Sequence, residues 1–467
     1  MKKKIFFLSL VFLFIGFFLS FKSLSSPLLF GDMDGYKRAN WGYHKYASGQ
    51  LLNFNEAGGA WLPFHPTILG LSILFFKDPV FSPRLITLIF SVFSIPLMYL
   101  YTRELFINDK RKEIVAIVAT FIYLIHPFRL FFATQPLSEP VSMFFFLLIL
   151  LFLSQKKLRL FLIIFFINLA SAIRFEFWYF IPIIWLVFFT NKYLKKQEVV
   201  IASALCLVFP FYWLFLNYSN FKSPFYFFSN KYRNAQKSPP QIPYYNFFLA
   251  TRGWIDSLIE VMSLTGIGIA FYGILNFFKK ETFGNLIFVL LPFYFLLLLI
   301  IQVFLGTMEW LAPRYLFPVV ITLIPFLSYG LIQIIQILSK KKKNIVFFLL
   351  LITISFFSIL EIYGFVINVK KWRQAVLNDN LHQVVELVNF YETQRNSFKE
   401  IIYVTSGDWV FPMFIYLSQR HDVSFLSTQE YSAFSNSDSM IILHSSSNSQ
   451  CKNKTSFSNY LFSVCLP

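Results

Sequence analysis

The sequence has 467 residues, of which 57% are hydrophobic and only 14% are charged, and its formal net charge is +18. Soluble domains are about 45–50% apolar and about 25% charged, so this composition excludes an ordinary soluble protein. Positive charge can indicate a nucleic-acid partner, but here the basic residues stand in short segments between apolar runs. That arrangement is typical of the inner side of a membrane, so no nucleic-acid partner is expected.

Apolar runs long enough to cross a membrane recur along the chain as far as residue 367. A spanning helix needs roughly 17–25 apolar residues, and we expect about eleven such helices, the ones between 140 and 189 being short. The predicted spans cover residues 5–21, 81–101, 114–131, 140–153, 160–173, 177–189, 199–216, 258–278, 286–305, 315–338 and 345–367. The first run could instead be a cleaved signal peptide, since a basic start precedes it and small residues follow it.

The composition of the loops predicts the orientation. Basic clusters occupy the short loops, at residues 2–4, 103–112, 156–159, 192–196, 279–280 and 340–343. Positive loops stay in the cytoplasm, which places the N-terminus inside. The long segments fall on the other side, at residues 22–80, 217–257 and 368–467. We therefore expect an all-α polytopic protein of a bacterial inner membrane, with its C-terminus and its functional site facing outward.

Residues 1–367 are expected to form the transmembrane domain, and residues 368–467 a separate small α/β domain outside the cytoplasm. The predicted elements of the second domain are strands at 401–405, 423–426 and 439–444 and a helix at 408–419. Cys451 and Cys465 lie in this region, where they could form a disulfide or remain two thiols.

Isolated carboxylates stand at the outward ends of the apolar runs. Asp32 and Asp34 follow the first run, within the sequence GDMDGY. Acidic residues at a membrane surface are costly and commonly functional, although a solvated turn or a helix cap is the alternative. Glu139 stands alone between two later runs on the same side. It is either an acid favoured by the dipole of a helix N-terminus or a second carboxylate of the same site.

Arginines on the outward side oppose the usual charge bias. Arg314 and Arg174 lie at outward turns, and Arg252 lies in the basic, aromatic segment 217–257. The planar guanidinium suits a phosphate, because it can bind two oxygens at once. The alternative is pairing within the chain, of Arg174 with Glu176 and of Arg314 with Glu309.

A metal site is a weaker expectation. His44 and His65 lie in the same outward segment as the two aspartates, and nitrogen and oxygen ligands of this kind bind divalent metals. The spacing of these residues does not place them on one helix face, and a lone external histidine is more commonly polar surface. A divalent metal is left open, and no other cofactor is expected.

Four short motifs, taken in order, resemble a known family. They are DMDGY at 32–36, WLPFHP at 61–66, LSEP at 137–140 and RYLFP at 314–318. With the predicted topology, residues 1–367 resemble the multi-spanning GT-C glycosyltransferases that use polyprenyl-phosphate sugars, a group that includes protein O-mannosyltransferases and aminoarabinose transferases. The resemblance implies transfer of a single sugar, outside the cytoplasm, from a polyprenyl-phosphate donor to a hydroxyl of a glycan, lipid or protein.

The resemblance also implies roles for individual residues. Asp34 matches the essential acid of the first loop, with Asp32 as the fallback, and it would be the general base for the acceptor hydroxyl. Glu139 matches a second acid, although other members have aspartate there. Direct attack on the donor would invert the anomeric centre. The residues expected to stabilise the leaving phosphate are Arg314, Arg174 and Arg252. The other candidates, expected near the acceptor, are His65, Tyr36, Glu309 and Tyr315.

Other functional classes remain as alternatives. A transporter or flippase would carry charged residues inside its spans and interrupted helices at mid-bilayer, whereas the predicted spans are almost free of charge. A ligase that transfers a whole glycan would need a similar fold. An assembly protein without catalysis is the remaining alternative.

Overall fold

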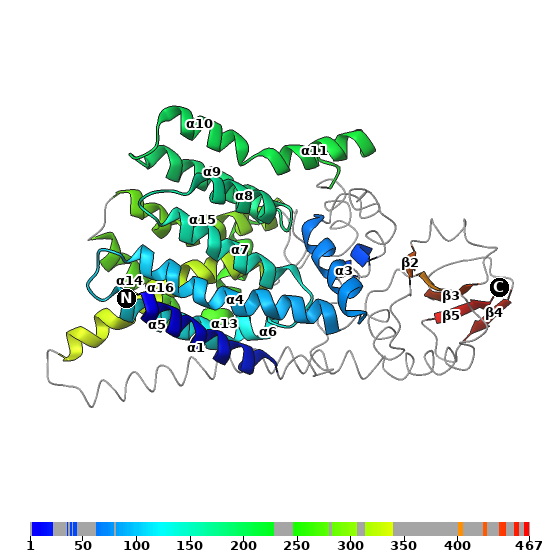
Figure 1. Ribbon diagram of the computed structural model, residues 1–467, viewed down its shortest axis with the longest axis horizontal. Helices are drawn as coiled ribbons and strands as arrows, with labels where there is room; N and C mark the ends of the chain where they lie inside the picture. The colour runs from blue at the N-terminus through cyan, green and yellow to red at the C-terminus, as the bar shows by residue number, and fades with distance from the viewer. Residues whose placement is uncertain are drawn as a thin grey trace.

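The computed structural model describes residues 2–21, 35, 38–39, 41–43, 62–78, 81–227, 246–279, 283–305 and 313–339, together with five strands after residue 399 (Figure 1). The spans expected over 5–338 correspond to helices, and that expected over 345–367 lies outside the described residues. The helices are α1 Lys2–Phe21, α3 Phe64–Phe76, α4 Phe81–Leu105, α5 Lys112–Ile125, α6 Pro127–Phe132, α7 Ser138–Leu153, α8 Leu160–Ser171, α9 Glu176–Thr190, α10 Lys196–Leu205, α11 Val208–Phe221, α13 Phe247–Met262, α14 Leu264–Phe278, α15 Phe283–Phe304, the short 3-10 helix η3 Pro313–Leu316, and α16 Phe317–Ser339.

Local residue chemistry determines where several of these helices begin and end. The side chain of Asn246 caps α13 by accepting a hydrogen bond from the backbone N–H of Leu249 at 3.0 Å. Lys77 and Lys222 adopt left-handed backbone conformations directly after α3 and α11, which closes these two helices. Between such ends the backbone bonds are internal to each helix, as a membrane interior requires.

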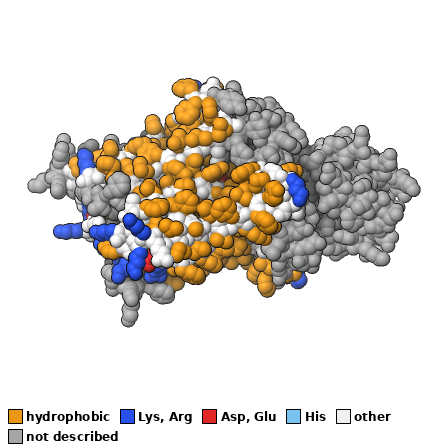
Figure 2. Space-filling view, turned by 90° about the horizontal axis from the view of Figure 1, so that it is seen from above, with side chains coloured by type: hydrophobic (Ala, Val, Ile, Leu, Met, Phe, Trp, Pro, Cys, Tyr) orange, Lys and Arg blue, Asp and Glu red, His pale blue; other side chains and the backbone are white. Residues whose placement is uncertain are grey.

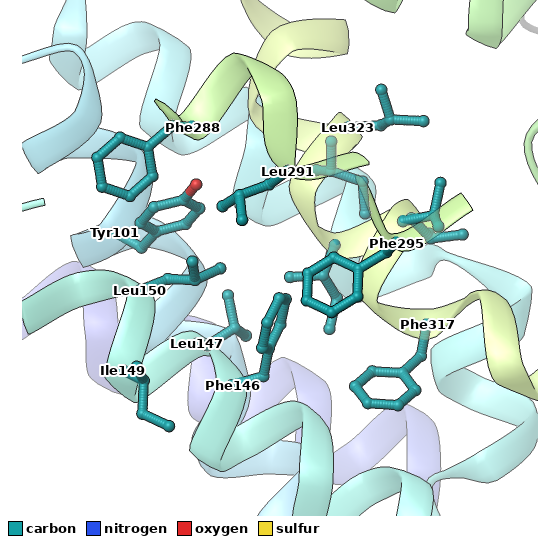
Figure 3. Packing of buried hydrophobic residues seen from close by; sticks show 14 of the residues in the cluster. Tyr101, Phe146, Leu147, Ile149, Leu150, Phe288, Leu291, Phe295, Phe317 and Leu323 are labelled. Atoms are coloured by element: carbon teal, nitrogen blue, oxygen red, sulfur yellow. The ribbon is translucent and has the colours of Figure 1, made fainter. Parts of the chain in front are cut away.

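Aromatic and aliphatic side chains from α4, α7, α15 and α16 form the centre of the bundle. Figure 3 shows Phe146 of α7, Phe295 of α15 and Phe317 of α16 lying next to one another. The ring centroids are 5.5 Å from Phe146 to Phe295 and 6.1 Å from Phe146 to Phe317, with steeply inclined planes. Such edge-to-face packing is favourable between aromatic rings. This core holds together helices that are far apart in the sequence.

Helices α14 and α16 approach each other closely through glycine. A Cβ at Gly273 would overlap the backbone carbonyl of Phe326, and a Cβ at Gly330 would overlap that of Ile269. Small residues allow such close approach between helices in a membrane protein. Gly268 of α14, by contrast, has open space around it.

The structure corrects three expected elements. The span expected over 258–278 is instead two helices, α13 and α14, which meet at Ser263 with a bend of 94°. Ser263 has a φ of 58°, and its side chain caps α14. Residues 114–131 do not form one helix, because Pro127 begins α6 after a break at His126. The outward segments 22–80 and 217–257 are not only loop, since the first contains α3 and the second contains the start of α13.

The expected number of about eleven spans is not confirmed. In the described part of the chain, four helical segments are long and apolar enough to cross a membrane, namely α4, α10 together with α11, α15 and α16, or five if α13 and α14 together count as one broken span. Helices α7, α8 and α9 have 16, 12 and 15 residues, which is short for a bilayer. The apolar helices still identify an integral membrane protein.

Contacts between distant segments define two ends of the bundle. At one end, Arg84 at the start of α4 donates a hydrogen bond to the carbonyl of Thr134, 3.1 Å away. Helix α4 then runs to the other end, where Arg111 contacts Gln336. We call this second end the basic end, because it carries Arg103, Arg111 and Lys112. Figure 2 shows hydrophobic side chains across the middle of one face, with most of the visible Lys and Arg gathered at one end.

The C-terminal residues contain a five-stranded sheet in the order β2-β1-β3-β5-β4. Strands β1 and β3 pair in parallel, and β3 and β5 pair antiparallel. The strands are β1 Glu400–Val404, β2 Ser424–Leu426, β3 Ser439–His444, β4 Asn453–Ser456 and β5 Phe462–Leu466. The first three coincide with the predicted strands. The predicted helix and Cys451 lie outside the described residues, so the α/β domain and the disulfide stay predictions.

Candidate functional site

Charged residues from four segments meet at the end of the bundle opposite the basic end. Glu139 lies in the first turn of α7, Arg174 in the connection from α8 to α9, Glu176 at the start of α9, and Arg314 in η3. We call these four residues the Glu139 cluster. Glu139 and Arg174 are almost fully buried, with side chains 2% and 8% exposed. Glu139 is thus an acid in the first turn of a helix, and the same carboxylate also belongs to a cluster, so both alternatives for its role stay predictions.

All three guanidinium nitrogens of Arg174 donate hydrogen bonds, two of them to Glu176 and one to both Glu139 and Ser138. Nη1 donates to Glu139 Oε1 at 2.7 Å and to Ser138 Oγ at 3.0 Å. Nη2 and Nε donate to the two carboxylate oxygens of Glu176 at 2.6 and 3.1 Å, which is a bidentate pair. Burial alone would lower the pKa of Arg174, but the charges of Glu176 and Glu139 outweigh it and raise that pKa above its ordinary value. The guanidinium therefore stays charged.

Arg314 approaches the same oxygen of Glu139 less closely. Its Nε lies 3.9 Å from Glu139 Oε1, and its side chain is 26% exposed. Tyr315 contacts both cations, because its ring centroid is 5.3 Å from the guanidinium carbon of Arg174 and 5.4 Å from that of Arg314. Phe317 adds a second ring, 5.5 Å from Arg174. Aromatic faces stabilise cations at such distances.

The two carboxylate oxygens of Glu139 differ in their surroundings. Glu139 Oε2 is buried and has no hydrogen-bond donor in the part of the chain that the structure describes. Leaving a buried acceptor without a donor costs about 1–3 kcal/mol, and more for a charged group. This oxygen can therefore accept from a substrate hydroxyl or from a group in the segments that lie outside the described ranges.

Two positions within the first outward segment, residues 22–80, lie against the elements of the Glu139 cluster. Gly35 lies so close to the backbone carbonyl of Pro136 that a Cβ would overlap it. The backbone N–H of Phe64 donates to the carbonyl of Ala172, 3.0 Å away, just before Arg174. Pro136 precedes Glu139 by three residues. The neighbours of Asp34 in the chain are thus held near Glu139.

The structure does not bring the remaining predicted site residues into the Glu139 cluster. Those that lie outside the described residues are Asp32, Asp34, Tyr36, His44 and Glu309. His65 is fully buried within α3. Arg252 is 69% exposed on α13 and forms a long surface pair with Asp256, 3.6 Å away. Among the described residues, no three His, Cys, Asp or Glu side chains are placed to hold a metal. A divalent metal stays an open question.

Three contacts of the site were not anticipated from sequence. Ser138 accepts a hydrogen bond from Arg174, Phe317 faces the same guanidinium, and Gly35 contacts Pro136. Ser138 and Phe317 lie within the LSEP and RYLFP motifs, so the sequence already marked both residues. Their contacts with Arg174 could not be predicted, because these residues come together only in the folded chain.

The arrangement suits the chemistry of an anion at a membrane surface. It offers a partly exposed guanidinium, an aromatic ring beside it, and a buried carboxylate oxygen with spare acceptor capacity. Arg314 could bind a phosphate, whereas the donors of Arg174 already bind two carboxylates and a hydroxyl. The carboxylate could orient a sugar or acceptor hydroxyl.

No protein-family model matches the sequence, and no curated protein matches it. Two crystal structures have the same fold, at 12% sequence identity each. ArnT from Cupriavidus metallidurans in the apo state superposes with a TM-score of 0.60 over 97% of this chain and 96% of that chain. ArnT from the same organism bound to undecaprenyl phosphate gives 0.61 over 97% of each chain. ArnT is an aminoarabinose transferase of the GT-C group, so the GT-C fold expected from the motifs is confirmed.

Proposed function

We propose, from the GT-C fold that this chain shares with ArnT, that it is a glycosyltransferase of the outer face of the cytoplasmic membrane. It moves a single sugar from a polyprenyl-phosphate donor to an acceptor hydroxyl. The undecaprenyl phosphate bound to ArnT supports a lipid of this class as donor. The observation that carries the proposal is the Glu139 cluster, which brings a buried carboxylate and two arginines together at the end opposite the basic loops.

The proposed reaction assigns a role to each arginine. Arg314 binds the phosphate of the donor and stabilises the charge that develops on it as the sugar–oxygen bond breaks. Its partial exposure and its long contact with Glu139 support this assignment. Arg174 holds Glu139 in position, because its donors are directed at Glu139, Glu176 and Ser138.

Asp34 is the proposed general base. It removes the proton of the acceptor hydroxyl as the oxygen attacks the anomeric carbon, with inversion at that carbon. A positioned base contributes typically 10²–10⁴-fold to such a reaction. The support comes from its neighbour Gly35, which lies against Pro136 close to Glu139. Asp32 is the alternative base in the same segment.

The test compares cells that carry the chain, cells that lack it, and cells with Asp34→Asn. Envelope glycolipids, polysaccharides and glycoproteins are profiled by mass spectrometry, and Asp256→Asn on the exposed face of α13 is the matched control. We expect one discrete sugar mass to disappear in the deletion and in Asp34→Asn and to remain in Asp256→Asn. Loss of a whole oligosaccharide would indicate the ligase alternative, and an unchanged profile in Asp34→Asn would refute the assigned base.

Within the described residues, the break between α13 and α14 is a feature that favours a transporter, since transporters carry interrupted helices near their binding sites. An assay in detergent micelles separates the two functions, because no membrane remains to be crossed. Purified protein with a polyprenyl-phosphate sugar and an envelope extract should release polyprenyl phosphate and label the extract. A transporter would do neither.

A further inference from the structure

A pocket of about 340 Å³ lies at the basic end, away from the Glu139 cluster. It is formed where α4 ends, α5 begins, and α14 and α16 pass beside them. Helix α4 separates the two sites, because Arg84 at its start contacts Thr134 near the Glu139 cluster while Phe106, just past its end, lines the pocket. The proposed sugar transfer does not use this pocket.

The floor of the pocket is aromatic and rigid. Phe106 stacks on Tyr329 with ring centroids 4.7 Å apart and meets Phe277 edge-on at 5.1 Å. The rings come from three separate segments, and the close glycine contact of α14 with α16 fixes two of them. These three rings are almost fully buried, so they form a preformed, rigid floor that fixes the position of the polar rim above it.

The rim of the pocket is polar and positively charged. Asp109 accepts from Nε and Nη2 of Arg111 at 3.0 and 2.9 Å, and Arg111 also lies 5.8 Å from the ring of Tyr329. The adjacent Lys110 is exposed and has no carboxylate partner among the described residues. Two cations therefore face one carboxylate on the pocket lining, so the rim attracts an anion.

Exposed apolar side chains continue outward from the same elements. Ile114 follows the rim by one turn of α5, and Phe278 follows Phe277 at the end of α14, and both are exposed. A small water-soluble anion would make no contact with these apolar side chains. A lipid would contact it with its acyl chains while its headgroup entered the pocket.

We propose that this pocket binds the headgroup of an anionic phospholipid from the leaflet at the basic end. Lys110 contacts the phosphate, Arg111 supports it from a fixed position, and the buried rings of Phe106 and Tyr329 hold the floor beneath the headgroup in place. By the charge of its loops this leaflet is the cytoplasmic one, which is rich in anionic lipids. The bound lipid would join the α4–α5 loop to the ends of α14 and α16.

The test measures lipid binding by the purified full-length chain. Native mass spectrometry in a neutral detergent, with added phosphatidylglycerol or phosphatidylcholine, gives the apparent dissociation constant of the first bound lipid. We expect phosphatidylglycerol to bind more tightly, and Lys110→Gln to weaken it by about fivefold, since one basic residue contributes about 1 kcal/mol near an anionic surface. The matched control is Lys157→Gln, an exposed lysine in the α7–α8 loop that does not line the pocket.

Three results would overturn the proposal. Equal weakening by Lys110→Gln and Lys157→Gln would mean general attraction to a basic surface. Unchanged binding in Lys110→Gln, with an unchanged melting temperature, would mean that the pocket does not bind the headgroup. Displacement of phosphatidylglycerol by millimolar glycerol 3-phosphate, but not by phosphatidylcholine, would identify a site for a free phosphate instead.

Discussion

Arg174 and Arg314 approach the same oxygen of Glu139 but are held differently. Arg174 is 8% exposed and lies 2.7 Å from that oxygen, while Arg314 is 26% exposed and lies 3.9 Å away. A buried ion pair is costly to break, because removal of one partner leaves the other charge without compensation. The two arginines should therefore respond to substitution in different ways, one in stability and one in substrate binding.

Arg174→Met should destabilise the protein by about 3–5 kcal/mol, since it leaves Glu139 as an uncompensated buried carboxylate. The measurement is thermal unfolding of the purified protein in detergent. Arg252→Met is the control, because its surface pair with Asp256 contributes about 0–1 kcal/mol. Adding Glu139→Gln to Arg174→Met should recover part of the loss. Similar shifts for Arg174→Met and Arg252→Met would contradict the buried pair.

Arg314→Lys should impair binding of the donor and leave stability almost unchanged. Lysine keeps the charge but loses the planar fork that binds two phosphate oxygens. We expect KM for the polyprenyl-phosphate sugar to rise about tenfold or more, since a hydrogen bond to a charged group contributes about 1.5–3 kcal/mol. Steady-state kinetics with varied donor concentration measure it. An unchanged KM would remove Arg314 from the phosphate site.

At this scale the sequence predicted that Glu139, Arg174 and Arg314 lie on the same side of the membrane, and the structure places them at one end of the bundle, but the sequence did not predict how they pair. Glu139, Arg174 and Tyr315 were selected by their position beside apolar runs, and the structure brings them together. The pairing of Arg174 with Glu176 could be predicted, because the two residues are only two positions apart in the sequence. The hydrogen bond from Arg174 to Glu139 could not, because the sequence does not indicate which distant segments come into contact.

Among the elements, the contact of α14 with α16 gives the sharpest test. Gly273→Ala should destabilise the protein by about 1–3 kcal/mol, because the new methyl group meets the backbone of Phe326, which cannot move aside alone. Gly268→Ala on the same helix has open space and should be neutral or slightly stabilising. The melting temperatures of the two purified variants measure this difference in stability. Equal effects would show that the close crossing is absent.

The breaks between helices were harder to predict than the helices. Hydropathy reports which residues are apolar and not the direction of the chain, so the 94° bend at Ser263 was missed. The break at Pro127 is different, because a proline inside an apolar run is itself a sequence signal for the end of a helix. Helix α3 was missed because its apolar run has only 13 residues, which is too short for a spanning helix.

For the whole molecule, the orientation predicted from basic loops can be tested by labelling. With the three native cysteines replaced by serine, Lys222→Cys after α11 should react with an impermeant maleimide in spheroplasts. Asn108→Cys at the basic end should react only after permeabilisation, since we place that end in the cytoplasm. Both positions are exposed in the structure. The reverse pattern would invert the predicted topology.

The general architecture was predictable because lipid constrains it. A chain with long apolar runs must form helices where it meets hydrocarbon. The number of spans was not predictable in the same way, since α7, α8 and α9 are apolar but only 16, 12 and 15 residues long. Short helices can be buried within the bundle as well as cross it, and composition does not separate the two.

The order in which the Glu139 cluster leaves the ribosome has a consequence for biosynthesis. Glu139, Arg174 and Glu176 are synthesised close together and can pair as soon as α7 to α9 have been inserted, whereas Arg314 emerges only with η3 and α16. The growing chain therefore neutralises its costly buried carboxylate early and can leave the insertion machinery without an unmatched charge. Arg314, which the proposed function assigns to the donor phosphate, is synthesised last, so on that proposal a nascent chain without η3 and α16 still lacks its phosphate ligand.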